Sequence, residues 1–422
     1  MINEVTKLKL QIDNTDKIIG TINISGSKNA SLPMLAVSIL TKEEIILHNV
    51  PNILDIEYMI NLLRSIGVKV RFNKETNILI MKKRKLKANI KSEYLDKIRA
   101  SYYLMGSLFS KKRKIKTNFP GGCNFEKRPI DYHLDAFRTM GAKVYSKNNQ
   151  IIIKRNKKLC SSIKLPTKSV GATINILLAS VLTNGITKII NPSLEPEVKE
   201  LINLLNQMGG SIAINKDNII ITGVKKLHGI TYKVMPDRIE AGSYLFLAAS
   251  AKQSNVLINN INVNHLKEVI KMITLSGVDI LIKENSIRVL KNSSIKNMNI
   301  VADNYPAFPT DLQQIATAAL LCANNTSTVK DNIYKNRFTE VNELKKMNAN
   351  IEKEDNKIII YPSTLIGTTV YAQDLRAGFS LIVAAVNANS YTTIENAEVI
   401  FRGYEHLIEK LKNININAKI IK

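Results

Sequence analysis

A short stretch near residue 120 combines several residue types that enzymes use for chemistry. Residues 120–128 read Pro-Gly-Gly-Cys-Asn-Phe-Glu-Lys-Arg, with one thiol, two glycines and two cations. Adjacent glycines adopt positive φ at low cost, so the stretch favours a loop over a helix or strand. Lys127 and Arg128 follow Cys123 closely and favour its thiolate form. This pattern is typical of a loop that carries a reactive cysteine.

The same residues also have a purely structural interpretation. A lone cysteine is commonly a small buried apolar residue. A Gly-Gly pair can mark nothing more than a hairpin turn. The loop by itself leaves both interpretations open, so the elements that would position it have to be considered.

Six segments of small, apolar residues each begin with polar or charged side chains. A helix that is apolar on all sides is buried. The N-terminus of a helix binds anions through its unpaired N–H groups and its dipole. If the helices of one domain point the same way, their starts form a common anion site. These starts are Lys28-Asn29-Ala30-Ser31, Arg99-Ala100-Ser101, Ser169-Val170-Gly171-Ala172-Thr173, Asp237-Arg238-Ile239-Glu240, Pro309-Thr310-Asp311 and Asp374-Leu375-Arg376-Ala377.

These segments belong to a sequence repeat that occurs six times, about every 70 residues. In each repeat a small-residue helix is followed by a β-branched strand, a turn, an amphipathic helix and two short strands. The amphipathic helix ends at a residue suited to the left-handed conformation, which is glycine or its usual substitute asparagine. These residues are Gly67, Gly141, Gly209, Gly277, Asn348 and Asn415.

The repeat predicts two domains of three units each. The first covers residues 24–235 and contains a catalytic loop at 118–130. The second covers residues 236–422 together with residues 1–23, because the sixth unit is cut short at Lys422 and the N-terminal strand within residues 4–23 can pair with it.

The formal charge of +25 raises the possibility of a nucleic-acid partner. The two basic runs, residues 82–85 and 111–114, lack interleaved aromatic residues and belong to no DNA-reading motif. We therefore expect solvated faces and no nucleic-acid partner, with part of the charge steering anionic substrates. The apolar runs are shorter than the ~18 residues of a membrane span, so no membrane partner is expected.

Cysteine and histidine usage narrows the class further. The three cysteines, Cys123, Cys160 and Cys322, are odd in number and far apart, which favours a reducing, cytoplasmic setting over a disulfide framework. Neither they nor the five histidines have metal-ligand spacing. We expect no metal and no cofactor.

A series of ordered motifs resembles the enolpyruvyl transferases over nearly the whole chain. The resemblance is to the members that act on UDP-N-acetylglucosamine, because those acting on shikimate 3-phosphate typically have Lys-Ser in place of Lys28-Asn29 and lack the loop cysteine. The motifs are residues 24–30, 99–101, 120–123, 128–131, 169–173, 195–197, 236–240, 308–311, 336–338, 374–377 and 402–405.

The resemblance implies a fold and a reaction. The fold is a two-domain inside-out α/β barrel built from six repeated βαβαββ-type units, three per domain. The reaction moves the enolpyruvyl group of phosphoenolpyruvate to the 3-hydroxyl of UDP-N-acetylglucosamine and releases phosphate, by addition and then elimination. This is the first committed step of peptidoglycan synthesis. We also expect the protein to be a monomer.

The resemblance also implies roles for individual residues. Cys123 would be the general acid and Asp311 the base, with Lys28 and Arg402 also catalytic. Asp237 and Glu240 are interpreted instead as helix-capping or hinge residues. The implied substrate-binding residues are Lys28, Asn29, Arg99, Arg128, Pro129, Ile130, Asp131, Tyr132, Ser169, Val170, Gly171, Asp311, Ile333, Arg337, Arg376 and Arg402.

Three departures from the family pattern keep an alternative open. Glu126-Lys127 replaces small residues in the loop, Phe401 stands before Arg402 where an acid is common, and asparagines replace two cap glycines. None of these changes removes a reacting group. The alternative is a nucleotide-sugar-binding paralogue of the same fold with little turnover.

Overall fold

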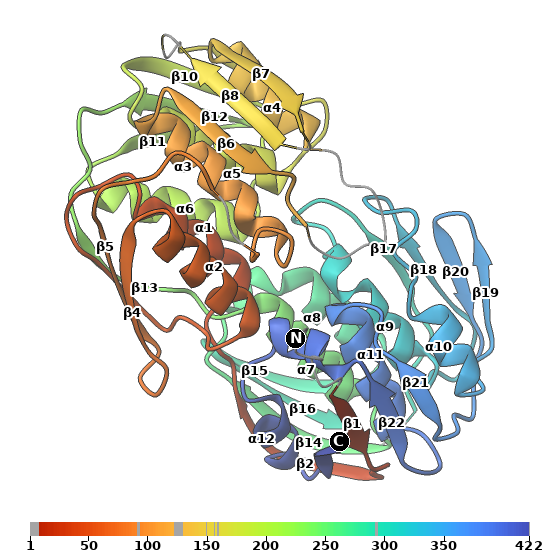
Figure 1. Cartoon of the computed structure of the whole chain (residues 1–422). Helices are drawn as coiled ribbons and strands as arrows, with labels where there is room; N and C mark the ends of the chain where they lie inside the picture. Colours follow the sequence, from red (N-terminus) through yellow and green to blue (C-terminus); the bar gives the residue numbers. More distant parts are fainter. Residues whose placement is uncertain are drawn as a thin grey trace. The chain divides into compact units, whose positions relative to one another are not determined.

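The computed structural model divides the chain into two compact units. Unit 2 is Gly26–Met235, and unit 1 combines Met1–Ser25 with Pro236–Lys422. The structure describes residues 8–90, 93–121, 130–148, 150–155, 157, 160–291 and 294–421. The chain thus passes between units twice, after Ser25 and after Met235 (Figure 1).

Unit 2 contains three sheets of closely similar topology. In each, an antiparallel hairpin is joined to a strand that precedes an amphipathic helix, and two sheets add a parallel fourth strand. The sheets are β4 (Val68–Asn73), β5 (Ile78–Lys83), β3 (Ile45–His48) and β13 (Ile230–Lys233); β7 (Ala142–Lys147), β8 (Gln150–Arg155) and β6 (Lys114–Asn118); and β11 (Ser211–Asn215), β12 (Asn218–Gly223), β10 (Gly185–Ile190) and β9 (Ser162–Lys164).

Unit 1 repeats the arrangement with three four-stranded sheets. Strand β2, from the N-terminal segment, takes the parallel position beside β14. The sheets are β15 (Asp279–Lys283), β16 (Ser286–Lys291), β14 (Gln253–Asn259) and β2 (Lys17–Asn23); β19 (Ile351–Glu354), β20 (Lys357–Ile360), β18 (Ser327–Asp331) and β17 (Asn299–Ala302); and β23 (Ala418–Ile421), β1 (Lys9–Ile12), β22 (Thr392–Glu395) and β21 (Thr369–Tyr371).

The N-terminal strand completes the last sheet, as the sixth sequence repeat predicts. Among the described residues β23 is the one strand after the last helix, and β1 pairs antiparallel with both β22 and β23. Leu10 and Ile12 of β1 are fully buried in the core of unit 1. The predicted pairing is therefore confirmed, although the N-terminal segment forms two strands and not one.

Each unit buries three helices in its interior. Small and apolar residues occupy nearly every position, so these helices are covered on all sides. In unit 2 they are α1 (Lys28–Val37), α3 (Tyr103–Lys111) and α5 (Val170–Ser180), and in unit 1 α7 (Arg238–Ser250), α9 (Gln313–Leu320) and α11 (Leu375–Val386). Helix α3 packs on α1 and α5, and α9 packs on α7 and α11.

A second set of helices is amphipathic and covers the sheets with one apolar side. Five of them come after one strand and before two, which is the predicted order, and the last is followed by β23 alone among the described residues. They are α2 (Leu54–Ser65), α4 (Asp131–Thr139), α6 (Pro196–Gln207), α8 (Lys267–Leu275), α10 (Val341–Lys346) and α12 (Leu407–Lys412).

The amphipathic helices end as the sequence predicts. The glycines that follow α2, α4, α6 and α8 have φ of 100°, 87°, 89° and 80°. Asn348 and Asn415 take the same place after α10 and α12, with φ of 67° and 62°. All six residues are left-handed, so the predicted cap positions are confirmed.

A further left-handed asparagine, which the sequence analysis did not predict, follows four of the six central strands. Its side-chain amide donates to a backbone carbonyl beyond the neighbouring parallel strand, as Asn49 does to Val234 at 2.9 Å and Asn396 to Ala372 at 2.7 Å. Asn191 and Asn260 do the same. Strands β6 and β18 end differently, in Pro120-Gly121 and in Asp331.

Among the described residues, no helix is both long enough and apolar enough to cross a bilayer.

Candidate functional site

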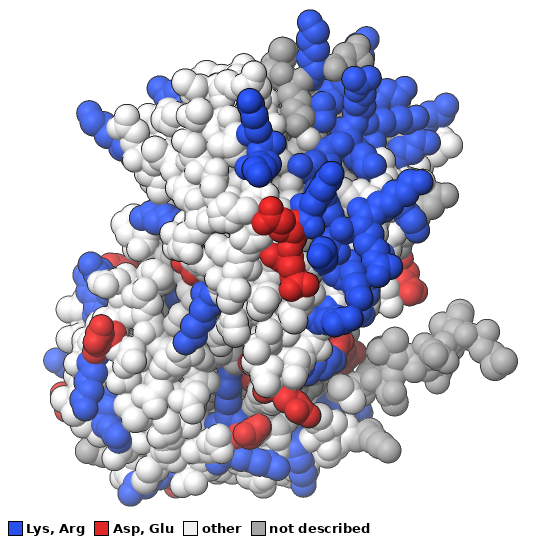
Figure 2. Space-filling view, turned by 90° about the vertical axis from the view of Figure 1, so that its left-hand side faces the viewer, with Lys and Arg blue, Asp and Glu red and all other residues white. Residues whose placement is uncertain are grey.

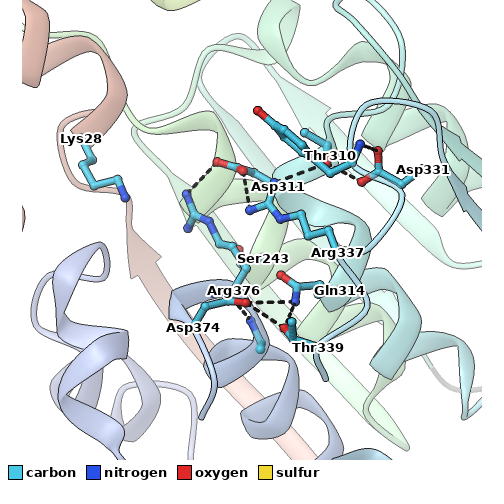
Figure 3. A network of polar contacts seen from close by, with 12 residues as sticks. Lys28, Ser243, Thr310, Asp311, Gln314, Asp331, Arg337, Thr339, Asp374 and Arg376 are labelled. Carbon is cyan, nitrogen blue, oxygen red and sulfur yellow. Dashed lines mark hydrogen bonds and ion pairs between the residues drawn. The ribbon is translucent and has the colours of Figure 1, made fainter. Parts of the chain in front are cut away.

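In unit 1 the polar residues gather where helix α9 begins. The short helix η3 (Thr310–Leu312) leads into α9 and carries Asp311. One carboxylate oxygen of Asp311 lies 2.7 Å from Arg337 Nη2, and the other lies 3.4 Å from Arg376 Nη2 (Figure 3). The side chain of Asp311 is 27% exposed, against 6% and 3% for the two arginines. The carboxylate is thus the accessible end of a cluster whose cations are buried.

Arg337 is fixed by a chain of contacts that runs to the end of strand β18. Burial opposes its charge, but Asp311 and Asp374 outweigh burial and raise the pKa of the guanidinium. Its Nη1 donates to the Thr310 hydroxyl at 3.3 Å, and that hydroxyl donates to Asp331. Arg337 therefore remains a cation at any physiological pH.

Asp331 is fully buried and shapes the segment that contains Ile333. Its Oδ1 accepts from the backbone N–H of Ile333 at 2.8 Å and of Tyr334 at 2.9 Å. This turn replaces the left-handed asparagine of the other strand ends and leaves Ile333 half-buried.

Arg376 lies in the first turn of α11, two residues after the cap residue Asp374. The Asp374 carboxylate accepts from the N–H of Arg376 at 2.8 Å and also from the Thr339 hydroxyl at 2.8 Å. The guanidinium carbon lies 5.4 Å from the centre of the Tyr404 ring. Burial opposes the charge on Arg376, but Tyr404 and Asp311 outweigh it, and the pKa is raised.

Tyr404 extends the cluster to the third buried helix. Its hydroxyl lies 2.8 Å from Ser243 Oγ, on the second turn of α7. The N-terminal halves of α7, α9 and α11 therefore meet, which is the arrangement that an anion site in this unit requires.

Behind this cluster lies an acid that the sequence analysis did not single out. Glu340 is fully buried and accepts from the side-chain amide of Gln314 at 3.0 Å. The same amide lies 3.4 Å from Asp374 Oδ2. Burial raises the pKa of Glu340 to about 8, so this carboxyl is largely protonated at neutral pH.

Arg402 ends the short helix η4 (Ala397–Arg402), two residues before Tyr404. Its side chain is half-buried. Phe401, at the position where an acid was expected, packs against the core of unit 1. Asp237 caps α7 by accepting from the N–H of Ile239 and Glu240, so its predicted capping role is confirmed.

In unit 2, Lys28 and Asn29 form the first turn of α1. Ser27 caps this helix by accepting from the N–H of Ala30 at 3.3 Å. Lys28 Nζ lies 3.5 Å from Asp55 Oδ2, and both side chains are largely buried. Asp55 comes from the first turn of α2, so the two helices together fix the position of the lysine ammonium.

A second group of predicted residues in unit 2 surrounds Tyr102. The guanidinium carbon of Arg99 lies 5.9 Å from the centre of the Tyr102 ring, and the His133 ring lies 4.6 Å from it. A Cβ on Gly171 would lie 2.6 Å from the Tyr102 hydroxyl, so only glycine fits there. Gly171 is the second residue of α5, which brings the start of that helix beside Arg99 and His133.

His133 is held neutral in this group. Its Nδ1 lies 2.7 Å from the Asn175 side-chain amide. Burial, and then the charge of Arg99, lower the pKa of His133 to about 3. An uncharged imidazole beside a guanidinium offers a hydrogen bond without adding a second cation.

The remaining predicted residues of unit 2 lie at helix starts near this group. Ser169 caps α5 by accepting from the N–H of Ala172 at 3.3 Å, with Val170 next in the chain. Ile130 precedes α4 and is buried, while Asp131 is exposed and Tyr132 half-buried in its first turn. Cys123, Arg128 and Pro129 lie outside the described residues. Cys160 and Cys322 are unbridged thiols.

Several residues that orient the predicted ones carry no specific signal in the sequence. Asp374 stands in one of the motifs without an assigned role, His133 lies close to one, and Asp55 lies in none. Their only signal is an acid or imidazole at the cap or in the first turn of a helix, which is common elsewhere. Contacts between separate repeats, such as Thr339 with Asp374, leave no spacing pattern in the sequence.

Comparison with known proteins gives the family. The model of the family EPSP synthase (3-phosphoshikimate 1-carboxyvinyltransferase) matches residues 12–411. A UDP-N-acetylglucosamine 1-carboxyvinyltransferase of Wolbachia sp. subsp. Brugia malayi is 38% identical over 96% of this chain and 98% of its own. UDP-N-acetylglucosamine 1-carboxyvinyltransferase 2 of Staphylococcus aureus strain MRSA252 is 39% identical over 93% and 94%.

Solved structures agree on the fold. The enolpyruvyl transferase NikO from Streptomyces tendae superposes with a TM-score of 0.90 at 19% identity, covering 98% of this chain and 99% of that one. EPSP synthase from Acinetobacter baumannii gives 0.72 at 17% identity, covering 98% and 100%. The predicted two-domain α/β fold is confirmed. The chain therefore belongs to the EPSP synthase family of enolpyruvyl transferases, together with the UDP-N-acetylglucosamine 1-carboxyvinyltransferases.

Proposed function

We propose that the chain transfers the enolpyruvyl group of phosphoenolpyruvate to the 3-hydroxyl of UDP-N-acetylglucosamine and releases phosphate, the first committed step of peptidoglycan synthesis. The observation that carries the proposal is the 38–39% identity, over nearly the full length, to proteins named for this activity. The geometry around Asp311 fits it, because an accessible carboxylate beside buried guanidiniums suits a reaction between a hydroxyl and an anion.

The reaction assigns a proton transfer to each of two residues. In the addition step Cys123 gives a proton to the methylene carbon of phosphoenolpyruvate, and the sugar oxygen bonds to the adjacent carbon. Asp311 takes the proton that the hydroxyl loses. In the elimination step the Cys123 thiolate takes a proton back from the new methyl group, the carbon–oxygen bond to phosphate breaks, and the double bond returns. The proton held by Asp311 leaves with the phosphate. Such proton transfers typically contribute about 100- to 10,000-fold in rate.

The cations of the site neutralise the anions of the substrates. Arg337 and Arg376 are buried and therefore fixed in place, which suits them to a carboxylate or phosphate group whose charge changes during the reaction. Lys28 and Arg402 have the same role in the proposal. The capped α5 start at Ser169, Val170 and Gly171 would bind the diphosphate, as helix starts do.

The rest of the sugar nucleotide would be bound by segments near these helix starts. In the proposal the chain from Arg128 through Tyr132 holds the uridine, and Arg99 lies beside the diphosphate-binding start of α5. Asn29 and Ile333 complete the set. Unit 2 would be the first enolpyruvyl transferase domain, with residues 118–130 as its catalytic loop, and unit 1 the second. The cytoplasmic location and the monomeric state stay predictions.

A coupled assay tests the proposal directly. Purified protein should release phosphate from phosphoenolpyruvate only when UDP-N-acetylglucosamine is present. The epoxide fosfomycin should alkylate Cys123, Cys123→Ser should resist it, and Cys123→Asp should keep activity if the residue acts as an acid. Tight binding of the sugar nucleotide with no phosphate release would refute the proposal in favour of a binding paralogue with little turnover.

A further inference from the structure

The positive charge of the chain is concentrated in one of its two units. Unit 2 has 36 Lys and Arg against 14 Asp and Glu, a surplus of 22, whereas unit 1 has 24 against 21, a surplus of 3. A bias in overall composition would enrich both units alike. The asymmetry indicates that the positive charge is localised on unit 2. Figure 2 shows a broad field of Lys and Arg on this unit.

Part of this charge lies on one face of the sheet β6–β8–β7. Residues 138–168, which include β7 and β8, contain nine Lys and Arg and no Asp or Glu. Strand pairing places Lys114 opposite Lys154, and Lys154 opposite Lys143. All three side chains are exposed. Neighbouring strands lie about 5 Å apart, so these lysines form a straight row across the sheet.

The other outward positions of the sheet do not compensate this charge. We call the lysine face the nine positions on this side of the strands, which contain five lysines, no acid and one buried residue, Ile152. They are Lys114, Lys116, Asn118, Lys143, Tyr145, Lys147, Gln150, Ile152 and Lys154. Like charges directly opposite each other destabilise a sheet. A face that retains this cost is suited to bind a partner of opposite charge.

The composition of the lysine face distinguishes between anionic partners. Its cations are all lysines, which are compact, strongly hydrated charges on flexible stems, and not the arginine forks that grip single phosphates. Tyr145 is its single aromatic residue, and Lys154 Nζ lies 5.5 Å from that ring. The face therefore has no stacking platform for single-stranded nucleic acid and no helix for a DNA groove. A broad layer of hydrated cations matches a broad anionic layer.

We propose that the lysine face docks the protein reversibly on the surface of an anionic lipid bilayer. The binding would be peripheral and electrostatic, with each lysine near the surface strengthening it about fivefold at moderate salt. Tyr145, which is 40% exposed, is of the type that lies at headgroup level. This inference does not rest on the proposed function, and it departs from the expectation, made from the sequence, of no membrane partner.

Co-sedimentation with vesicles tests the proposal. The full chain is mixed with phosphatidylcholine vesicles that contain about one-third phosphatidylglycerol, or none, at about 0.1 M and about 0.5 M salt. The test variant combines Lys114→Gln, Lys143→Gln and Lys154→Gln. The matched control combines Lys283→Gln, Lys330→Gln and Lys419→Gln, which removes the same charge from exposed strand lysines of unit 1.

We expect binding to the anionic vesicles only, lost at the higher salt and weakened roughly 100-fold in the test variant but little in the control. Thermal unfolding of the test variant should occur at the same or a higher temperature, since a repulsive row has been removed. Equal weakening by both triple variants would overturn the proposal. So would tighter binding, at the same salt, to a short DNA duplex or a single-stranded oligonucleotide than to the vesicles.

Discussion

At the scale of single residues, the candidate site separates an accessible carboxylate from buried cations. Asp311 pairs with the guanidiniums of Arg337 and Arg376. Arg337 is held in turn by Thr310, and Arg376 lies over the ring of Tyr404. The side chains that react with substrate must be reachable, while those that only stabilise charge work best when they are immobile and dry. The exposures of Asp311, Arg337 and Arg376 follow that division.

Replacing Asp311 by asparagine should separate these two functions. Asp311→Asn keeps the shape of the side chain but removes the proton acceptor, so we expect kcat to fall by about 100- to 10,000-fold. Substrate affinity should change far less, because Arg337 and Arg376 remain. Steady-state kinetics and calorimetric titration with UDP-N-acetylglucosamine would measure the two effects. A variant with nearly full kcat would exclude Asp311 as the base.

His133 should make stability depend on pH. Burial keeps its folded pKa at about 3, whereas the unfolded chain binds a proton near 6.5. Below pH 6.5 the unfolded state therefore holds more protons, and the free energy of unfolding should fall as pH falls, by up to about 1.4 kcal/mol per pH unit. Urea unfolding between pH 7 and pH 4 would measure this slope. In His133→Phe the contribution of this residue should vanish, and an unchanged slope would assign the effect to other groups.

The sequence indicated the members of the ion-pair cluster better than the residues that hold them. Asp311, Arg337 and Arg376 stand in motifs, and the structure places them within ion-pair distance of one another. Glu340 and Asp331 could not be found in that way. Each gains its role by being buried against a residue more than 20 positions away in the chain, Gln314 for Glu340 and Thr310 for Asp331, and burial is decided by packing that a linear pattern does not encode.

At the scale of elements, the repeat is most regular where the backbone is most constrained. The left-handed residue after each amphipathic helix was predictable, because few residues adopt that conformation. The asparagine after the central strands was missed, since its amide bonds to a different segment of the chain. This asparagine is absent after β6 and β18. Those two strands lead instead to the predicted catalytic loop and to Asp331 of the candidate site.

Two glycines in equivalent places should respond differently to alanine. At Gly277 a Cβ would meet only the flexible Lys296 side chain, at 3.5 Å, so Gly277→Ala should cost about 1–2 kcal/mol, the left-handed strain alone. At Gly67 the Cβ would lie 2.3 Å from the Lys85 carbonyl oxygen, and Gly67→Ala should cost clearly more. Denaturant unfolding would compare them. Equal costs would show that the backbone near Lys85 moves aside easily.

At the scale of the whole molecule, the order of strands in several sheets differs from their order in the chain. Strand β13 closes a sheet of unit 2, β2 closes a sheet of unit 1, and β1 lies between the last two strands of the chain. The sequence predicted the pairing of the N-terminal segment from the missing strand of the sixth repeat. It did not predict that β2 and β13 take the parallel positions beside β14 and β3.

The position of β1 makes the C-terminal unit depend on the start of the chain. Leu10 and Ile12 are fully buried, whereas Lys9 and Gln11 are partly exposed on the other face of the strand. Removing a buried Leu or Ile side chain typically costs about 2–5 kcal/mol, so Leu10→Ala with Ile12→Ala should remove several kcal/mol, a large part of the stability of a domain. Lys9→Ala with Gln11→Ala should cost about 1 kcal/mol or less, since the pair of Lys9 with Glu395 is exposed.

Hydrogen exchange would show where that loss falls. Because β1 bonds to β22 and β23, amides in these strands should exchange faster in the double core variant. Amides in β10 and β12, which belong to unit 2, should keep their protection, and the control variant should leave both sets unchanged. Faster exchange throughout both units would mean that the chain unfolds as one cooperative body. In that case the N-terminal strand would govern the stability of the whole molecule and not of unit 1 alone.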